Sequence, residues 1–238
     1  MPGAKNSFAA LDAVGDDESV ATASSVQEKE PVESCSSHDE QEKDSASGSG
    51  RRRTLRNPLV WVDLEMTGLD IEKDTIIEVA VIITDGDLER SVQGPATAIH
   101  HSDEVLGAMN EWCIQHHGAS GLTQRCRDSK VDMAAAEQMV LDFITEHTEE
   151  GAAQLAGNSV HVDRMFLLKH MPRVVAHLSY RIVDVSSIKE LARRWFPKTY
   201  RKAPRKALAH TALSDIKESI EELKYYRKAV FKDPRQCK

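Results

Sequence analysis

The sequence predicts an α/β fold in which helices flank a mixed sheet. Apolar runs of strand length, rich in β-branched residues, come first along the chain. Later runs of this kind alternate with stretches whose apolar residues recur every three or four positions, as on one face of a helix. The early runs are almost continuously apolar, which is typical of strands covered on both faces. Strands that cluster early and then alternate with helices favour a layered fold with a mixed sheet.

Each predicted strand is a short apolar run followed by turn or polar residues. The first is LVWVDLE, residues 59–65, and the second is TIIEVAVIIT, residues 75–84, which the turn residues DGDL follow. The third has residues 97–101 of ATAIHH as its core. AQLAG at 153–157 and SYRIVDV at 179–185 are the fourth and fifth.

Each predicted helix carries apolar residues on one face. The helices are expected at residues 102–117, 132–147, 162–170, 186–195 and 211–228. Pro172 ends the third helix and Pro197 ends the fourth, because proline cannot continue a helix.

The first 57 residues differ from the rest of the chain. Residues 1–50 hold 11 acidic and three basic residues and no periodic apolar pattern, and the basic run RRRTLR follows them. Such a segment buries too little apolar surface to offset its ordering entropy, so a disordered tail is expected over 1–57. One folded domain is expected over 58–238. The basic run is either a solvated charge run at the domain edge, a nuclear address or a phosphate-contacting arm.

Composition excludes several classes of protein. No apolar run reaches the ~18 residues of a membrane helix, so no membrane association is expected. The four cysteines form no CxxC pair and no zinc spacing, which argues against a disulfide scaffold or a zinc finger. The net charge of −7 excludes a generally basic surface for nucleic acid. A cytoplasmic location is the default expectation. The mitochondrion is the alternative, although the acidic tail is a poor transit peptide.

Asp63 and Glu65 are the first chemical signal. Residues two apart in a strand project to the same face, so two carboxylates should meet near the end of the first strand. Burying like charges together is costly, and a divalent cation such as Mg²⁺ or Mn²⁺ removes that cost. The alternative is that the strand simply ends there and both acids face water.

The second and third signals lie at helix starts. Asp163 follows the turn Gly157–Ser159 in the first turn of a helix, where an acid is also favoured by the helix dipole alone. His210 and Asp215 are five residues apart, so on one helix they would point about 140° apart. They can converge only if His210 lies in the loop before the helix; otherwise it is an ordinary surface histidine.

Together these residues indicate phosphodiester chemistry. Four acids could hold two metal ions roughly 4 Å apart, which stabilise the attacking and leaving oxygens of a phosphoryl displacement. A histidine, with an ordinary pKa of about 6.5, is suited to take a proton from the attacking water.

Four segments resemble the oligoribonuclease family: DLEMTGL from Asp63, GNSVHVDRMFL from Gly157, YRIVDVSSIKELARRWFP from Tyr180 and HTALSDI from His210. This family belongs to the DEDDh branch of 3′-to-5′ exonucleases, which share a ribonuclease H-like fold. The resemblance covers about residues 58–231. It implies that domain 58–238 is an exonuclease domain in which Asp63, Glu65, Asp163 and Asp215 hold two Mg²⁺ or Mn²⁺ ions. His210 would activate the attacking water.

The resemblance also implies a substrate and an oligomeric state. The substrate would be short single-stranded RNA, down to dinucleotides, and the products nucleoside 5′-monophosphates. Residues matching Leu69 and Trp112 wedge and stack against the bases. Those matching His117, Ser159, Arg181 and Ser186 contact the 5′ phosphate and the backbone. Tyr180 matches a residue that the second subunit of a homodimer contributes. One departure is Ser214, where the family often has an acid.

Two other functions remain open at this point. One is a broader 3′-to-5′ exonuclease that acts on long single strands or DNA ends. The other is a module that binds RNA ends without cleaving them, although a binder of polyanions would gain by losing its acids.

Overall fold

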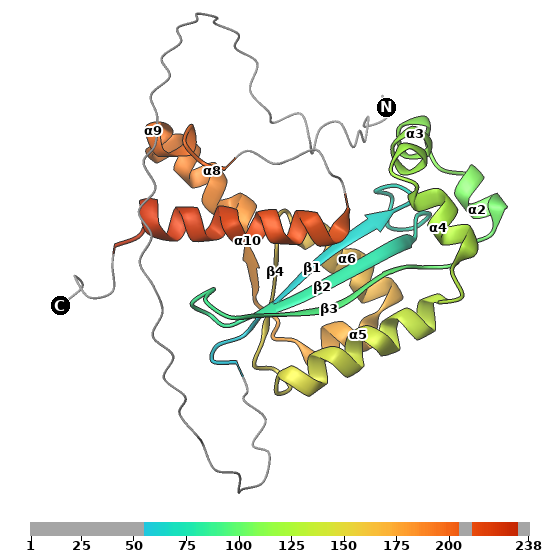
Figure 1. Ribbon diagram of the computed structural model, residues 1–238, viewed down its shortest axis with the longest axis horizontal. Coiled ribbons are helices and arrows are strands. Elements are labelled where there is room, and N and C mark those ends of the chain that lie inside the picture. The colour runs from blue at the N-terminus through green and yellow to red at the C-terminus, as the bar shows by residue number, and fades with distance from the viewer. Residues whose placement is uncertain (1–54, 205–210, 233–238) are drawn as a thin grey trace, which may run out of the picture. The chain divides into compact units, whose positions relative to one another are not determined.

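A five-stranded mixed sheet forms the centre of the computed structural model, which describes residues 55–204 and 211–232 (Figure 1). The strand order is β3-β2-β1-β4-β5. The predicted α/β class is therefore confirmed. Nearly all of the expected tail, and the segment that contains His210, lie outside the described residues.

Three antiparallel strands and two parallel ones make up this sheet. β1 (Leu59–Met66), β2 (Ile76–Thr84) and β3 (Ser91–Ala98) are antiparallel neighbours. β4 (Gln154–Gly157) pairs in parallel with β1, and β5 (Ile182–Asp184) pairs in parallel with β4. β4 contacts only the first half of β1, since their register ends at Trp61 and Ala156. The second half of β1 therefore extends beyond β4.

Helices cover both faces of the sheet (Figure 1). On one face, α5 (Met133–His147), α6 (His161–His170) and α7 (Pro172–His177) pack onto the even-numbered residues of β1. On the other, α8 (Val185–Trp195) and α10 (Ala212–Ala229) pack onto the odd-numbered ones. Because both faces are buried, the strands β1 and β2 are apolar almost throughout.

The third strand and the first helix differ from their predicted ranges. β3 is Ser91–Ala98 rather than a strand centred on 97–101, because it pairs with β2 along its length in spite of Gly94 and Pro95. The single helix expected over 102–117 is two helices, α2 (Asp103–Gly107) and α3 (Glu111–Ala119). The side chain of Asn110 accepts a hydrogen bond from the Cys113 amide, which caps the new helix start.

Three short helices were not predicted: α4 (Leu122–Asp128), α7 and α9 (Pro197–Tyr200). Both α7 and α9 begin with a proline that was predicted only to end the preceding helix. Proline is also well suited to the first turn of a helix, so each of these prolines starts a new one. Within the described part of the chain, no helix is both long and apolar enough to span a bilayer.

Candidate active site

The carboxyl end of β1 carries two half-buried acids on one face. Asp63 and Glu65 lie on the same side of the sheet as Trp61, which is fully buried against α10. This follows from the two-residue period of a strand. The even-numbered neighbours Leu64 and Met66 point into the opposite core. The two carboxylates therefore project toward the helix layer that contains α10.

A third acid reaches this place from the start of α10. Asp215 lies in the first turn of this helix, where its charge is favoured by the helix dipole. Thr211 caps the helix by accepting from the Ser214 amide, and the Ser214 hydroxyl accepts from the Thr211 amide. Ser214, the departure from the family pattern, thus completes a capping box and fixes the first helical turn.

These three carboxylates converge. One oxygen from each of Asp63, Glu65 and Asp215 can be chosen so that all three lie within 4.8 Å of one another. Asp215 is far from the other two in sequence, and the packing of α10 on β1 brings them together. Oxygen ligands at this spacing suit a hard divalent cation such as Mg²⁺ or Mn²⁺.

Asp163 lies beside this group and is buried, with 7% of its surface exposed. Its Oδ1 accepts a hydrogen bond of 3.0 Å from the amide of Leu64, between Asp63 and Glu65. That amide is available because β4 ends before this part of β1. Burial raises the pKa of Asp163 to about 7, and the nearby carboxylate of Asp184 adds to this increase. Such a carboxylate gains strongly from a nearby cation, so the donor set fits a divalent metal.

His117 of α3 lies next to Glu65. Its side chain is 1% exposed, its Nε2 is 3.0 Å from the carbonyl oxygen of Met66, and its Nδ1 is 4.0 Å from a Glu65 oxygen. Burial lowers the pKa of His117, which favours the neutral ring. In this structure the histidine supports the end of β1, and its contact with substrate stays a prediction.

Ser159 and Ser186 meet where β4 and β5 end. The Ser159 amide donates both to Asp184 Oδ1 at 3.0 Å and to Ser186 Oγ at 2.8 Å. Ser159 has a backbone φ of 51°, which residues other than glycine rarely adopt. The two hydrogen bonds of its amide hold the backbone in this conformation. Asp184 also accepts from the Ser186 amide, which caps α8.

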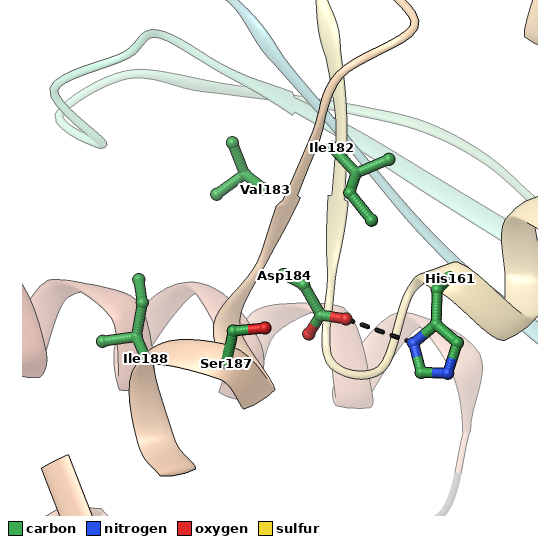
Figure 2. A pocket seen from close by; sticks show the side chains of 6 residues that line it. All are labelled: His161, Ile182, Val183, Asp184, Ser187 and Ile188. Atoms are coloured by element: carbon green, nitrogen blue, oxygen red, sulfur yellow. Dashed lines mark hydrogen bonds and ion pairs between the residues drawn. The ribbon is translucent and has the colours of Figure 1, made fainter. Parts of the chain in front are cut away.

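A shallow pocket opens beside Asp184, which accepts hydrogen bonds from the amides of both serines (Figure 2). It is lined by His161, Ile182, Val183, Asp184, Ser187 and Ile188. In Figure 2 the ring of His161 points toward Asp184, with 3.4 Å between Nδ1 and Oδ2. The pocket lies at the starts of α6 and α8, where the helix dipoles favour negatively charged groups.

Two residues that build this region were not predicted as site residues. Asp184 joins the Ser159 turn to α8, and its position directly before a predicted helix was a capping signal that could have found it. Asn158 donates to Ser219 and Glu222 of α10, at 2.8 and 3.2 Å. It ties the turn that leads to Asp163 to the helix that carries Asp215. Its partners are too distant in sequence to be predicted.

The remaining predicted substrate residues lie around this centre. Leu69, in the loop after β1, is half-buried. Trp112 of α3 is also half-buried and stacks on His116 with ring centroids 4.5 Å apart. Tyr180 is 77% exposed just before β5, and the guanidinium of Arg181 lies over its ring at 5.2 Å. His210 lies outside the described residues, directly before the cap of α10.

The sequence is similar to a known exonuclease family and to several oligoribonucleases. The model of the exonuclease family matches residues 60–223. Mitochondrial oligoribonuclease of Mus musculus is 54% identical over 179 residues, which cover 75% of this chain and 76% of that protein. Oligoribonuclease of Colwellia psychrerythraea is 53% identical over 174 residues, covering 73% of this chain and 96% of that one. The Arabidopsis thaliana oligoribonuclease is 49% identical, covering 86% and 92% respectively.

Solved structures share the fold. Exonuclease I from Methylocaldum szegediense superposes with a TM-score of 0.57 at 17% identity, covering 73% of this chain and 41% of that one. E. coli exonuclease I in complex with a dA16 oligonucleotide gives a TM-score of 0.58 at 15% identity, with the same coverage. This chain thus spans about two-fifths of the length of those proteins, and the likeness concerns the fold.

The mixed sheet with its acidic cluster defines an exonuclease, a hydrolase of phosphodiester bonds, with the ribonuclease H-like fold. Within that class, the chain belongs to the oligoribonuclease family.

Proposed function

We propose that this chain is a 3′-to-5′ exoribonuclease that degrades short single-stranded RNA, down to dinucleotides, to nucleoside 5′-monophosphates. The observation that carries this proposal is the meeting of Asp63, Glu65 and Asp215 at the end of β1. Membership of the oligoribonuclease family supports the substrate class. The non-cleaving alternative is disfavoured because a binding module for a polyanion would not gather acids at its centre.

Asp63, Glu65, Asp163 and Asp215 would hold two Mg²⁺ or Mn²⁺ ions. When bound, these ions neutralise charge on the phosphate and stabilise the attacking and leaving oxygens. The protein keeps three of these carboxylates within 4.8 Å of one another, at the cost of mutual repulsion. Asp163 carries a separate cost, because burial raises its pKa.

His210 would take the proton from the attacking water. The role requires a neutral imidazole within hydrogen-bond reach of that water. The described structure supports this role indirectly. Thr211 caps α10, so His210 immediately precedes the helical turn that presents Asp215.

The substrate contacts follow from the positions of the other residues. Leu69 and Trp112 would contact the bases, since stacking on apolar and aromatic side chains tolerates any sequence. Ser159, Ser186 and Arg181 would hold the 5′ phosphate beside the starts of α6 and α8. His117 would contact the RNA backbone next to Glu65.

Hydrolysis of RNAs of defined length tests this function. With 5′-labelled RNAs of two to seven nucleotides and Mg²⁺, we expect release of mononucleotides, with the highest kcat/KM on dinucleotides. Excess chelator should abolish the activity, and added Mg²⁺ or Mn²⁺ should restore it. Equal rates on twenty-nucleotide RNA or on DNA would favour the broader exonuclease. Binding without any release would favour the non-cleaving module.

We also propose a homodimer in which Tyr180 of one subunit completes the site of the other. The 77% exposure of this ring beside the sheet-edge strand β5 supports the proposal. Exposed apolar side chains lie nearby in sequence, with Ile182 at 37%, Leu191 at 43% and Trp195 at 66%. Light scattering should therefore give twice the chain mass of 26.5 kDa.

Mixing one weakened and one inactive variant tests whether Tyr180 acts across the dimer. Tyr180→Ala should lower kcat/KM on dinucleotides about tenfold, the scale of one lost stacking contact. Asp215→Asn alone should be inactive. After subunit exchange, a mixed dimer contains one site with all four acids and the partner's tyrosine, so we expect part of the activity to return. No recovery, or a fully active monomer, would contradict the proposal.

We propose the cytoplasm as the compartment, with the mitochondrion as the alternative. The acid-rich composition of residues 1–50 disfavours a transit peptide. The name of the mouse relative, a mitochondrial oligoribonuclease, supports the alternative. Microscopy of the full chain with a C-terminal fluorescent fusion decides between them: we expect a diffuse signal, and overlap with a mitochondrial dye would overturn this.

A further inference from the structure

The loop that joins β1 to β2, residues 67–75, is closed at its base by the two threonines at its ends. We call it the Leu69 loop. The Thr67 amide donates to the carbonyl oxygen of Thr75 at 3.0 Å. The Thr75 amide in turn donates to the hydroxyl oxygen of Thr67 at 3.1 Å. The loop therefore leaves and re-enters the sheet at a fixed spacing, immediately after the two acids of β1.

Asp74 occupies the interior of the Leu69 loop. Its Oδ1 accepts from the Thr67 hydroxyl at 2.9 Å, and its Oδ2 accepts from the Asp70 amide at 2.8 Å. The second bond fixes the backbone directly after Leu69. Gly68 leaves room for the carboxylate, because a Cβ at this position would lie 2.2 Å from Asp74 Oδ2. A side chain at position 68 would therefore displace the carboxylate and break the network.

Helix α6 holds the outer side of the same loop. Lys169 donates from Nζ to the carbonyl oxygens of Ile71 and Glu72, the latter at 3.0 Å. His170 Nε2 lies 3.3 Å from the carbonyl oxygen of Asp74. Since α6 also carries Asp163, the helix connects the Leu69 loop to the acidic centre.

We propose that Asp74 is a positioning residue that fixes the Leu69 turn relative to the acidic centre and so sets the affinity for the shortest RNAs. This inference rests on the proposed function, in which Leu69 contacts a base. A side chain held in its bound conformation before binding loses little entropy when substrate arrives. A dinucleotide makes few contacts, so it depends more on one pre-organised contact than a longer RNA does.

Substitutions at the two ends of the network test the proposal on the full chain. Asp74→Ala removes both acceptors. We expect it to raise KM for a dinucleotide about tenfold, to raise KM for a pentanucleotide much less, and to change kcat less than threefold. Thr67→Val removes the hydroxyl and keeps the volume, so it should give the same pattern. Glu72→Gln, at an exposed position in the same loop, is the matched control and should leave both KM values unchanged.

Asp74→Asn separates hydrogen bonding from charge. Its oxygen can accept from the Asp70 amide, and its amide nitrogen can donate to Thr67 Oγ1, which has a second lone pair. We therefore expect Asp74→Asn to keep a KM within about threefold of the wild type. A general loss of stability would instead lower the unfolding temperature and affect RNAs of both lengths equally.

Several results would overturn the proposal. They are an unchanged dinucleotide KM in Asp74→Ala, an equal increase for both substrate lengths, and a loss confined to kcat. If Asp74→Ala fails to fold, Thr67→Val decides by the same criteria. If Leu69→Ala raises KM and neither loop variant does, the positioning role is wrong and the proposed function stands. If the wild type releases no mononucleotide, the proposed function is wrong. Fluorescence anisotropy of a labelled dinucleotide then still tests the positioning role, because Asp74→Ala should weaken binding about tenfold.

Discussion

Replacing Asp215 with asparagine is expected to reduce kcat at least about 1,000-fold. Asp215 lies with Asp63 and Glu65 in one group of carboxylates within 4.8 Å. Removing one charge from such a group weakens metal binding, and the metals supply several kcal/mol of transition-state stabilisation. Single-turnover hydrolysis of a labelled dinucleotide at saturating Mg²⁺ measures the loss.

The fold of this variant is expected to survive. The start of α10 is capped by Thr211 and Ser214, which are unchanged. The substitution also removes one charge from a repelling group, so the unfolding temperature in chelator should not fall appreciably. Glu221→Gln, at an exposed position further along α10, is the control and should retain full activity. Wild-type turnover in Asp215→Asn would remove this residue from the metal site.

Replacing His210 with alanine is expected to lower kcat by about 10²- to 10⁴-fold, the range for loss of a general acid or base. The acidic cluster remains, so the KM for a dinucleotide should change little. His100→Ala, at an exposed position, is the matched control. Full activity of His210→Ala at neutral pH would contradict the role.

The pH profile gives the sharper test of His210. A base must be neutral, so the wild-type kcat should fall as the pH decreases through the pKa of the imidazole. The variant should lack this dependence, and added imidazole should restore part of its rate. A variant with the same acid limb as the wild type would show that another group titrates there.

Local patterns in the sequence were sufficient for most of the fold. The run of residues 59–65 predicted β1, and its two-residue period placed Asp63 and Glu65 on one face, as in the structure. The amphipathic pattern at 132–147 predicted α5, which is Met133–His147 in the structure. The apolar pattern at 211–228 predicted α10, which carries Asp215 in its first turn.

Local patterns were insufficient where pairing or packing overrides propensity. β3 forms through Gly94 and Pro95 because β2 offers a paired edge, although both residues disfavour strands. The helix expected over 102–117 is interrupted because Asn110 caps a separate helix, α3, which packs against α4. The short helices α4 and α7 have too few residues to show a periodic pattern.

The sequence by itself determined which residues could bind metal and which elements carry them, because strand period and helix caps are local properties. Only the tertiary structure decided that Asp215 meets Asp63 and Glu65 and that Asp163 lies beside them, because this depends on β1 lying between β2 and β4 and on α10 packing against β1. The burial of Asp163 is decided at the same level. β4 is too short to pair with the end of β1. The Leu64 amide therefore makes no bond to β4 and instead donates to the Asp163 carboxylate, which it holds beside the other acids.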